Sequence, residues 1–327
     1  TSGPGATNLV TGIATAYMDS VPMVAITGNV PTPLIGQDSF QEVYIAGITM
    51  PITKHNFVVD RVEDLADILR EAFRIAQTGR KGPVLVDIPK DMTSALAEFV
   101  PAAPVRDAYT TKIDMDAIDK AAEIINNAKR PAIYYGGGVI SSGASAELSA
   151  LMKKTCMPGA YTLMGAGVID SDDPLNLGMV GMHGTHAANI AVSRCDLLIA
   201  VGCRFSDRVA LSPRHFAPNA KIVHIDIDRA EIDKNVLTDH HIIVLEMLNE
   251  KLTAHDYPEW KEYVFSNKEV ELQPIPGKLL PKEVLDSITR LTDGDAIMAT
   301  DVGQHQMWVA QYFHFNRPGQ LITSGGF

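Results

Sequence analysis

Short apolar runs that alternate with amphipathic helical patterns constrain the fold of this chain more than any other feature. Residues 83–88 have the length and apolar character of a buried strand, and residues 62–76 before them repeat apolar side chains at helical spacing. Such alternation, which continues through most of the chain, is typical of parallel sheets with helices on both faces, so the sequence predicts an α/β fold. The further strands that we expect are residues 21–27, 132–135, 197–201, 222–227 and 296–300.

Two interruptions of this pattern divide the chain into three expected domains. Residues 92–104 are rich in Ala and Pro, and residues 256–279 mix charges with prolines, and both compositions are typical of connections between domains. We therefore expect one domain in residues 1–100, a central domain in residues 105–255, and the start of a third in residues 280–327. Residues 256–279 would be a linker.

Charge and composition argue against several kinds of partner. The 327 residues carry 39 acidic and 28 basic side chains, a net charge of −11, and the basic residues form no block. This balance does not favour nucleic acid or an anionic membrane as a partner. The three cysteines have no metal or redox spacing, which indicates a reducing, cytoplasmic location. No apolar run reaches the roughly 18 residues that a membrane span needs.

Three polar motifs each have two interpretations. Residues 136–143, rich in Gly, could let the backbone approach a diphosphate, or could form only a tight turn. Asp226 and Asp228 could accept hydrogen bonds from ribose hydroxyls, or could cap a helix. His183 and His186 lack Asp, Glu or Cys at ligand spacing, which favours polar contacts at the start of a helix over a metal site.

A fourth motif begins after Asp301. Residues 302–308 predict a turn followed by a helix, which would present backbone N–H groups to an anion. His305 could donate a hydrogen bond to a phosphate oxygen, or could cap its own helix. Arg80 and Lys90, taken alone, are typical of solvated surface charges near the ends of elements.

Taken in order, the motifs of this chain resemble those of the acetolactate synthases, a family of thiamine-diphosphate-dependent enzymes. The resemblance extends over essentially the whole sequence. The matching segments are residues 1–8, 28–31, 36–42, 78–80, 88–91, 181–185, 204–208, 224–228 and 302–308.

The resemblance implies the domain types, the reaction and the cofactors. The first domain would be the later part of a pyrimidine-binding domain, the second a Rossmann-like FAD domain, and the third the start of a diphosphate-binding domain. The enzyme would condense two pyruvates, or pyruvate and 2-oxobutanoate, with loss of carbon dioxide, in branched-chain amino-acid biosynthesis. It would use thiamine diphosphate, Mg²⁺ and an FAD that takes no electrons. A homodimer or tetramer with a small regulatory subunit is expected.

Roles for individual residues also come from the resemblance. Phe40 and Gln41 would line the substrate channel, with Pro31 and Lys90 at its mouth. The second ketoacid would dock beside Met182 and Arg208, because a guanidinium presents a planar fork to a carboxylate. The residues expected to contact FAD are Arg80, Gly181, His183, Gly184, Thr185, Gly202, Cys203, Arg204, Phe205, Asp226, Ile227 and Asp228. The residues expected near thiamine diphosphate are Gly303, Gln304 and His305.

The sequence departs from the family pattern in four places. The catalytic glutamate is expected before Thr1 and the magnesium ligands after Phe327, so we expect a piece cut short at both ends and inactive alone. A Gly-Asp turn is missing after residues 240–243, which predicts weak or no FAD retention, and Ser206 replaces an Asp of many relatives. The alternatives are another thiamine-diphosphate enzyme, such as a pyruvate oxidase or glyoxylate carboligase, or a non-catalytic nucleotide-binding remnant.

Overall fold

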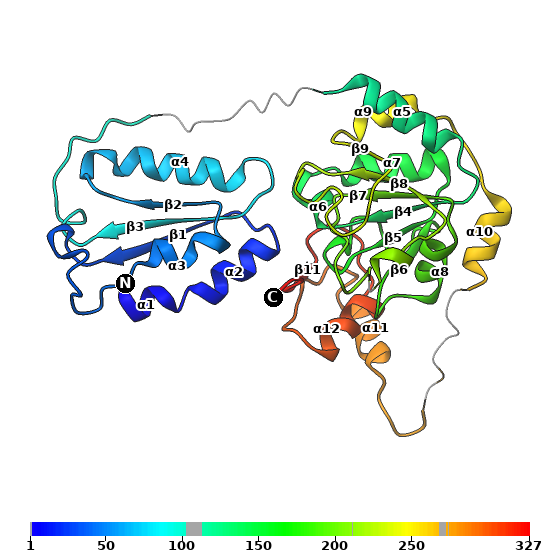
Figure 1. The fold of residues 1–327 in the computed structure, drawn as a ribbon. Coiled ribbons are helices and arrows are strands. Elements are labelled where there is room, and N and C mark those ends of the chain that lie inside the picture. The colour runs from blue at the N-terminus through cyan, green and yellow to red at the C-terminus, as the bar shows by residue number, and fades with distance from the viewer. Residues whose placement is uncertain (1, 103–112, 211, 268–272, 274) are drawn as a thin grey trace. The chain divides into compact units, whose positions relative to one another are not determined.

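The computed structural model describes residues 2–102, 113–210, 212–267, 273 and 275–327. They form two compact units (Figure 1). The first unit contains the described residues up to Ala102 together with Ser324–Phe327, and the second contains those from Ile113 to Thr323. No helix in the described ranges has both the length and the apolar character needed to cross a membrane.

The first unit is built on a parallel sheet. Within its described residues three strands, β1 (Met23–Asn29), β2 (His55–Val58) and β3 (Pro83–Pro89), lie in the order β1-β3-β2. Successive residues of a strand point to opposite faces, so Leu85 packs in one core and Val84 in a second. Figure 1 shows the corresponding helices on the two sides of this sheet, with α4 on one side and α1 to α3 on the other. The helices are α1 (Gly3–Thr7), α2 (Val10–Met18), α3 (Ile45–Thr49) and α4 (Leu65–Gln77), with short 3₁₀ turns η1 (Thr32–Leu34), η2 (Met50–Ile52) and η3 (Val62–Asp64).

The second unit is built on a larger parallel sheet. Over its described residues this sheet has six strands in the order β6-β5-β4-β7-β8-β9. Numbered from β4, this is the order 3-2-1-4-5-6 of doubly wound nucleotide-binding folds. The chain leaves β4 toward one edge and returns after β6 to build the other edge, so the order reverses between β4 and β7. The strands are β4 (Pro131–Tyr135), β5 (Gly159–Tyr161), β6 (Asn176–Met179), β7 (Leu197–Val201), β8 (Lys221–Ile225) and β9 (His240–Ile242).

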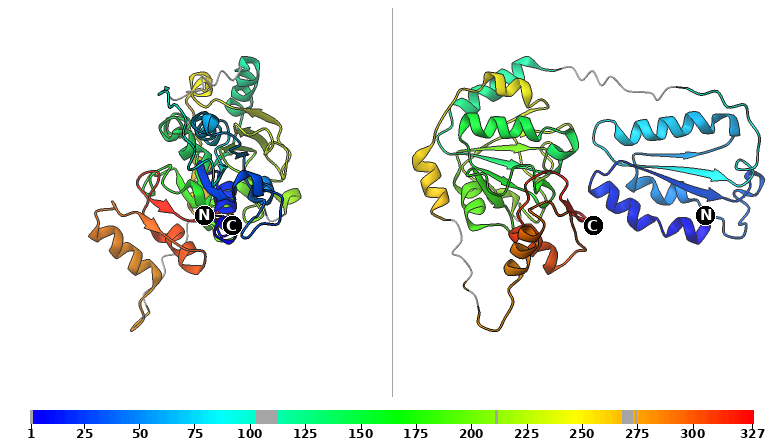
Figure 2. Two further views of the ribbon diagram at one scale, coloured as in Figure 1. Left: turned by 90° about the vertical axis from the view of Figure 1, so that its left-hand side faces the viewer. Right: turned by 180° about the vertical axis from the view of Figure 1, so that it is seen from behind.

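Helices cover the larger sheet on both faces. Connections between parallel strands are right-handed, so the connections from β4 to β5 and from β6 to β7, which run in opposite directions along the sheet, place their helices on opposite faces. Both views in Figure 2 show α5 beside α9, and these two helices contact each other. The helices are α5 (Met115–Asn126), α6 (Gly137–Ser142), α7 (Ser145–Thr155), α8 (His186–Arg194), α9 (Glu246–Lys251), α10 (Pro258–Phe265), α11 (Pro281–Leu291) and α12 (Gln304–Tyr312), with 3₁₀ turns η4 (Leu163–Gly165) and η5 (Pro213–His215).

The central core is a continuous cluster of apolar side chains between sheet and helices. All five residues of β4 and of β7 are buried, as expected for strands covered on both faces. The indole Nε1 of Trp260 donates to the Pro131 carbonyl oxygen at 2.8 Å, which fixes α10 against the start of β4.

Several expected boundaries were wrong. The first strand begins at Met23 rather than Val21, because the Val21 N–H bonds to the Ala16 carbonyl and stays in the turn after α2. The strand expected over residues 296–300 is only β10 (Met298–Ala299), which pairs with β11 (Leu321–Ile322). The expected α/β class with parallel sheets is confirmed.

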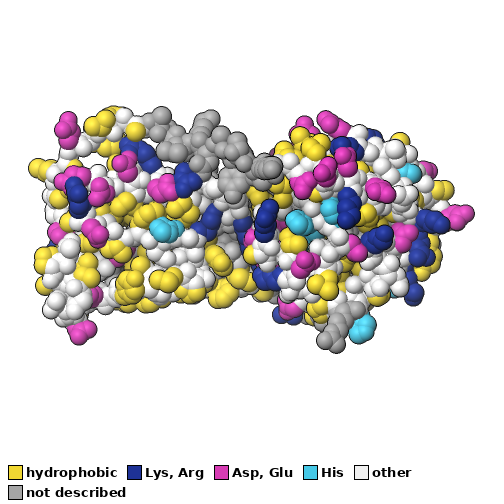
Figure 3. All heavy atoms as spheres, turned by 45° about the horizontal axis from the view of Figure 1, so that its top comes forward, with side chains coloured by type: hydrophobic (Ala, Val, Ile, Leu, Met, Phe, Trp, Pro, Cys, Tyr) yellow, Lys and Arg dark blue, Asp and Glu magenta, His cyan; other side chains and the backbone are white. Residues whose placement is uncertain are grey.

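Charges of both signs are interspersed on the face seen in Figure 3. Apolar side chains lie between them, and single exposed apolar residues are normal on a protein surface. Phe40 is among the most exposed large apolar residues, at 89%.

Candidate functional site

The predicted FAD segments converge at one edge of the larger sheet. Each directly follows a parallel strand: residues 181–185 follow β6, residues 202–205 follow β7, and residues 226–228 follow β8. Because carboxyl ends of parallel strands share an edge, the structure brings these segments together. The reversal of strand order between β4 and β7 lies at the same edge, which is where ligands bind in open α/β sheets.

Glycines let the turns after β4 and β7 pack backbone against backbone. A Cβ on Gly138 would lie 2.6 Å from the Gly202 Cα, and the Gly138 N–H donates to the Gly202 carbonyl at 2.8 Å. A Cβ on Gly136 would lie 2.7 Å from the Cys203 Cβ. Gly202 has φ +54°, in the left-handed region that favours glycine. The glycine run thus begins α6 and holds the two turns together.

The loop after β6 is fixed by two polar side chains. The Asn189 amide accepts from the Gly181 N–H and donates to the Gly181 carbonyl, both at 3.0 Å. Thr185 is the N-cap of α8 and accepts from the Ala188 N–H at 3.1 Å. His183 is exposed, and its carbonyl accepts from the Gln311 side chain at 2.7 Å. These contacts hold the backbone of the loop, while the imidazole of His183 is exposed to solvent.

Met182 and Arg208 are brought together by their backbones. The Met182 N–H donates to the Arg208 carbonyl at 2.9 Å. A Cβ on Gly181 would lie 2.7 Å from the same carbonyl, so the close approach requires glycine there. The Arg208 side chain is 71% exposed and pairs loosely with Asp207 at 3.8 Å, so its guanidinium can reach another anion.

Asp226 is a partly buried carboxylate at the end of β8. It accepts from the Asp228 N–H at 2.8 Å. Burial raises the pKa of the Asp226 carboxyl, although the Asp228 N–H and the nearby His224 oppose the shift. A carboxylate that water solvates poorly is a strong acceptor for a ligand hydroxyl, and a perturbed pKa at a sheet edge is typical of functional sites.

The predicted channel residues of the first unit follow its strands in the same way. The Lys90 N–H donates to the Asn29 carbonyl at 3.1 Å, which places the segment after β3 beside Pro31 after β1. Beneath them Asp87, 1% exposed, accepts from the Thr27 hydroxyl at 2.7 Å and from the Asn29 amide at 2.6 Å. This buried carboxylate ties the ends of β1 and β3 together.

Phe40 and Gln41 lie on an exposed loop. Glu42 accepts from the Gly36 and Ser39 N–H groups, and these bonds lower the pKa of the Glu42 carboxyl. Gln41 has φ +61°, and its carbonyl would lie 2.5 Å from a Cβ on Gly3. The loop is therefore folded back on itself, with the aromatic ring of Phe40 turned to solvent.

The remaining predicted residues lie on other elements. Arg80 donates from Nε to the Ser20 hydroxyl at 2.9 Å, within the first unit. Gly303, Gln304 and His305 form the start of α12 in the second unit, and His305 is exposed. A group of three or more His, Cys, Asp or Glu side chains that could hold a metal ion does not occur in the part of the chain that the structure describes.

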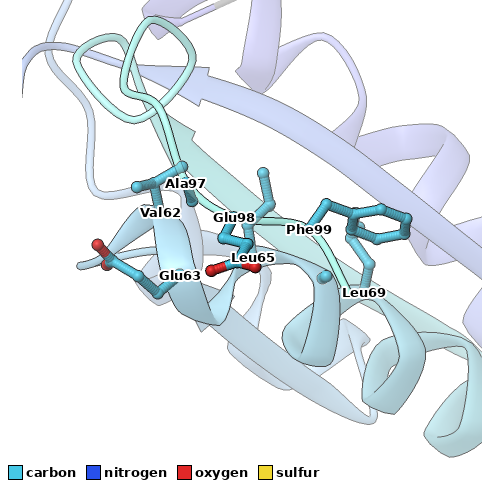
Figure 4. A pocket seen from close by; sticks show the side chains of 8 residues that line it. Val62, Glu63, Leu65, Leu69, Ala97, Glu98 and Phe99 are labelled. Atoms are coloured by element: carbon cyan, nitrogen blue, oxygen red, sulfur yellow. The ribbon is translucent and has the colours of Figure 1, made fainter. Parts of the chain in front are cut away.

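An apolar hollow also lies in the first unit. It has a volume of about 270 Å³ and lies between the start of α4 and the segment around Phe99 (Figure 4). Leu65, Leu69 and Phe99 point into it, and Glu63 and Glu98 lie at its border. It contains none of the predicted site residues.

Sequence reasoning missed three contributors to the edge of the larger sheet. Leu163–Gly165, after β5, packs against the glycine turn, with a Cβ on Gly165 only 2.8 Å from the Tyr135 carbonyl. Asn189, in α8, holds the loop after β6, and His224, in β8, holds the loop after β7. Gly165 was the available sequence signal for the first. The bonds of Asn189 to Gly181 join residues eight apart, whereas the contact of His224 with Cys203 depends on strand order, which local sequence does not specify.

A doubly wound α/β unit with polar loops at its carboxyl edge, in a chain that also contains a second parallel-sheet unit, is typical of α/β cofactor-binding enzymes. Family models agree. Residues 118–246 match the central domain of thiamine pyrophosphate (TPP) enzymes. Residues 1–48 match the N-terminal TPP binding domain of these enzymes, and residues 301–327 match their C-terminal TPP binding domain.

Curated relatives narrow the class. The chain is 47% identical over 349 residues to the probable acetolactate synthase large subunit of Methanocaldococcus jannaschii, covering 100% of this chain and 59% of the relative. It is 45% identical over 335 residues to the Escherichia coli isozyme 1 large subunit, covering 99% and 59%. It is 48% identical over 343 residues to the Parasynechococcus marenigrum large subunit, covering 100% and 55%. The chain belongs to the acetolactate synthase large-subunit family of thiamine pyrophosphate enzymes, and spans less than two thirds of the length of these relatives.

Proposed function

We propose that this chain carries cofactor- and substrate-binding parts of a thiamine-diphosphate-dependent acetolactate synthase. The enzyme would join two pyruvates, or pyruvate and 2-oxobutanoate, with loss of carbon dioxide. The observation that carries the proposal is similarity along the whole chain, at 45% to 48% identity, to three large subunits named for this activity. The same similarity does not favour pyruvate oxidase, glyoxylate carboligase or a non-catalytic remnant.

FAD would bind at the carboxyl edge of the larger sheet. Two features of this edge support it: the reversal of strand order and the poorly solvated Asp226 carboxylate, which suits a ribose hydroxyl. The loops that follow β6 and β7 would contact the rest of the dinucleotide, with Arg204 as a cation for the diphosphate. The flavin would have a structural role, and the turn missing after Ile243 would make its binding weak.

Thiamine diphosphate would be approached by the start of α12, where the N–H groups of the first helical turn favour an anion. His305, exposed in that turn, would donate to a phosphate oxygen. When bound, the thiazolium ring would serve as the electron sink for the loss of carbon dioxide. We assign no residue of this chain to the accompanying Mg²⁺.

Roles in ketoacid binding are proposed for residues of each unit separately. Phe40 and Gln41 would line the path of the ketoacids, and Pro31 and Lys90 would lie at its entrance. Arg208 would hold the carboxylate of the second ketoacid through two parallel hydrogen bonds, with Met182 against its carbon chain. A homodimer or tetramer with a small regulatory subunit is part of the proposal, since the relatives are named large subunits.

The proposal is tested in a chimaera. Residues 1–327 replace the matching segment of the Escherichia coli isozyme 1 large subunit, and acetolactate formed from pyruvate is measured. We expect acetolactate to form, and to form more slowly at low pyruvate concentration after Arg208→Ala substitution. A chimaera that binds thiamine diphosphate and flavin normally but forms no acetolactate would contradict the proposed activity.

A further inference from the structure

The loop after β7 has no regular secondary structure, yet its backbone carbonyls are held by side chains from three other segments. The Cys203 carbonyl accepts from His224 Nε2 at 3.1 Å. The Arg204 carbonyl accepts from the Tyr134 hydroxyl at 3.0 Å, and the Phe205 carbonyl from the Asn235 amide at 2.8 Å. Three consecutive carbonyls are thus each fixed by a different donor.

The N–H groups of the same three residues have no such partners. Within the described ranges, the backbone N–H groups of Cys203, Arg204 and Phe205 donate to no protein acceptor, although the preceding Gly202 N–H donates to the Ile225 carbonyl at 2.8 Å. Successive N–H groups without an internal acceptor are donors available to a ligand anion. The loop therefore has its acceptors occupied and its donors free.

Two of the three anchors are buried, which makes them rigid. Tyr134 and His224 are each 0% exposed. The Phe205 ring meets the His224 ring edge to face at 5.2 Å and lies 5.9 Å from the Tyr134 ring, so the loop also packs on its own anchors. A buried hydroxyl and a buried imidazole can each adopt few orientations.

The hydrogen bond to a carbonyl oxygen determines which ring nitrogen of His224 carries a hydrogen. A carbonyl oxygen only accepts, so Nε2 carries the N–H. No partner for the buried Nδ1 occurs in the part of the chain that the structure describes, which suits the neutral ring with Nδ1 unprotonated. Burial accordingly lowers the pKa of His224, against the opposing effects of its charged neighbours. The titratable groups that face it are Cys203, Asp226, Glu231, Asp233 and His241.

We propose that Tyr134, His224 and Asn235 are positioning residues that hold the loop of residues 203–205 so that its N–H groups bind the diphosphate of a dinucleotide. The ligand half of this inference rests on the proposed FAD site. The three residues do not touch the diphosphate themselves; they act by tying the carbonyls, so that the donors need no rearrangement when the anion arrives.

Tyr134→Phe is the cleanest test, because the chain provides a matched control. It removes one hydroxyl and keeps the ring. The neighbouring Tyr135 is equally buried, and its hydroxyl has no hydrogen-bond partner among the described residues. Tyr135→Phe therefore makes the same chemical change in the same strand without touching the loop.

His224 supplies the second pair of variants. His224→Leu removes the donor to Cys203, whereas His224→Gln offers an amide N–H at about the position of Nε2. Two quantities are measured on the 327-residue chain: hydrogen exchange of residues 202–208 without ligand, and the dissociation constant for FAD by flavin fluorescence. For Tyr134→Phe and His224→Leu we expect faster loop exchange and FAD binding weaker by about tenfold, the effect of one lost hydrogen bond to a buried group. Tyr135→Phe and His224→Gln should resemble the unchanged chain.

Two results would overturn the inference. In the first, Tyr134→Phe shows the same loop exchange and the same FAD affinity as Tyr135→Phe. In the second, His224→Gln is as impaired in both measurements as His224→Leu. A chain that binds no FAD at all would contradict the proposed FAD site instead. The hydrogen-exchange rates of residues 202–208 would then still test whether Tyr134 and His224 hold the loop. The two failures are therefore distinguishable.

Discussion

The Met182 N–H donates to the Arg208 carbonyl at 2.9 Å, which joins the loop after β6 to the loop after β7. The two strands are not neighbours: β5 and β4 lie between them in the sheet. Loops from separate strands thus bring the backbones of Met182 and Arg208 together, and the side chains of both residues are exposed. We expect this pair to bind the second ketoacid.

Arg208→Ala in the chimaera should raise the KM for the ketoacid by about 10- to 100-fold, because a hydrogen-bonded charge pair is lost. Arg208→Lys should recover only part of the affinity, since an ammonium lacks the planar fork. Steady-state kinetics with pyruvate measure both. Arg194→Ala, at an exposed arginine in the last turn of α8, is the control and should leave the KM unchanged. Equal KM values for the Arg208 and Arg194 variants would count against this role.

Gly138→Ala should destabilise the second unit by about 1–3 kcal/mol, because the new methyl group would overlap the Gly202 backbone. Urea unfolding followed by circular dichroism measures the loss. Gly12→Ala in α2 is the control: no atom lies within 4 Å of its Cβ position, so it should stabilise the first unit by about 0.5–1 kcal/mol through helix propensity. If Gly138→Ala is as stable as Gly12→Ala, the close packing of Gly138 on the Gly202 backbone is contradicted.

Acid should weaken the second unit through His224. Burial lowers the pKa of this histidine in the folded chain, whereas the unfolded chain titrates near its usual value of about 6.5. As pH falls below that value, the unfolded chain takes up a proton that the folded chain does not, so stability is lost until the lower folded pKa is reached.

Asp226 acts in the opposite direction, because its folded pKa is raised and protonation relieves the cost of its burial. Comparison with His224→Gln isolates the histidine. Between about pH 7.5 and about pH 5.5, the urea midpoint should fall more for the unchanged chain than for His224→Gln. Parallel pH profiles of the two proteins would show that His224 does not titrate in this way.

Asp87→Ala should destabilise the first unit by about 2–4 kcal/mol, because the Thr27 hydroxyl and the Asn29 amide lose a shared buried acceptor. Asp91→Ala is the control. Asp91 likewise accepts from two donors, the N–H and the hydroxyl of Thr32, but it is only partly buried, so water can replace it. Urea unfolding of the first unit should therefore change much less for Asp91→Ala; equal losses would contradict a structural role for Asp87.

Local sequence predicted the elements of the fold better than their ends. The buried strand at residues 197–201 was predicted correctly, because five consecutive apolar residues are typical of a strand covered on both faces. The first strand was placed two residues early, since Val21 has strand propensity but its N–H is used in the turn after α2. Gly28 and Asn29 have low propensity and become strand only through pairing with β3.

The site was predictable only as separate segments. Motifs placed Met182 and Arg208 in the same site by resemblance, but their hydrogen bond depends on the order of strands, which is a long-range property. The sequence predicted His224 only as part of a strand. Spacing along the sequence does not specify its hydrogen bond to the Cys203 carbonyl. For Gly138 the sequence leaves both a tight turn and a phosphate loop open, and it does not specify the close packing of this residue on Gly202.

The central claim is that the carboxyl edge of the larger sheet binds FAD through Asp226. Equilibrium titration of the purified 327-residue chain with FAD, followed by flavin fluorescence, tests it most directly, with Glu250→Ala in α9 as an exposed carboxylate control. We predict saturable binding that Asp226→Ala weakens by about tenfold or more and that Glu250→Ala leaves unchanged. No saturable binding, or equal affinity of the Asp226 and Glu250 variants, would contradict the account.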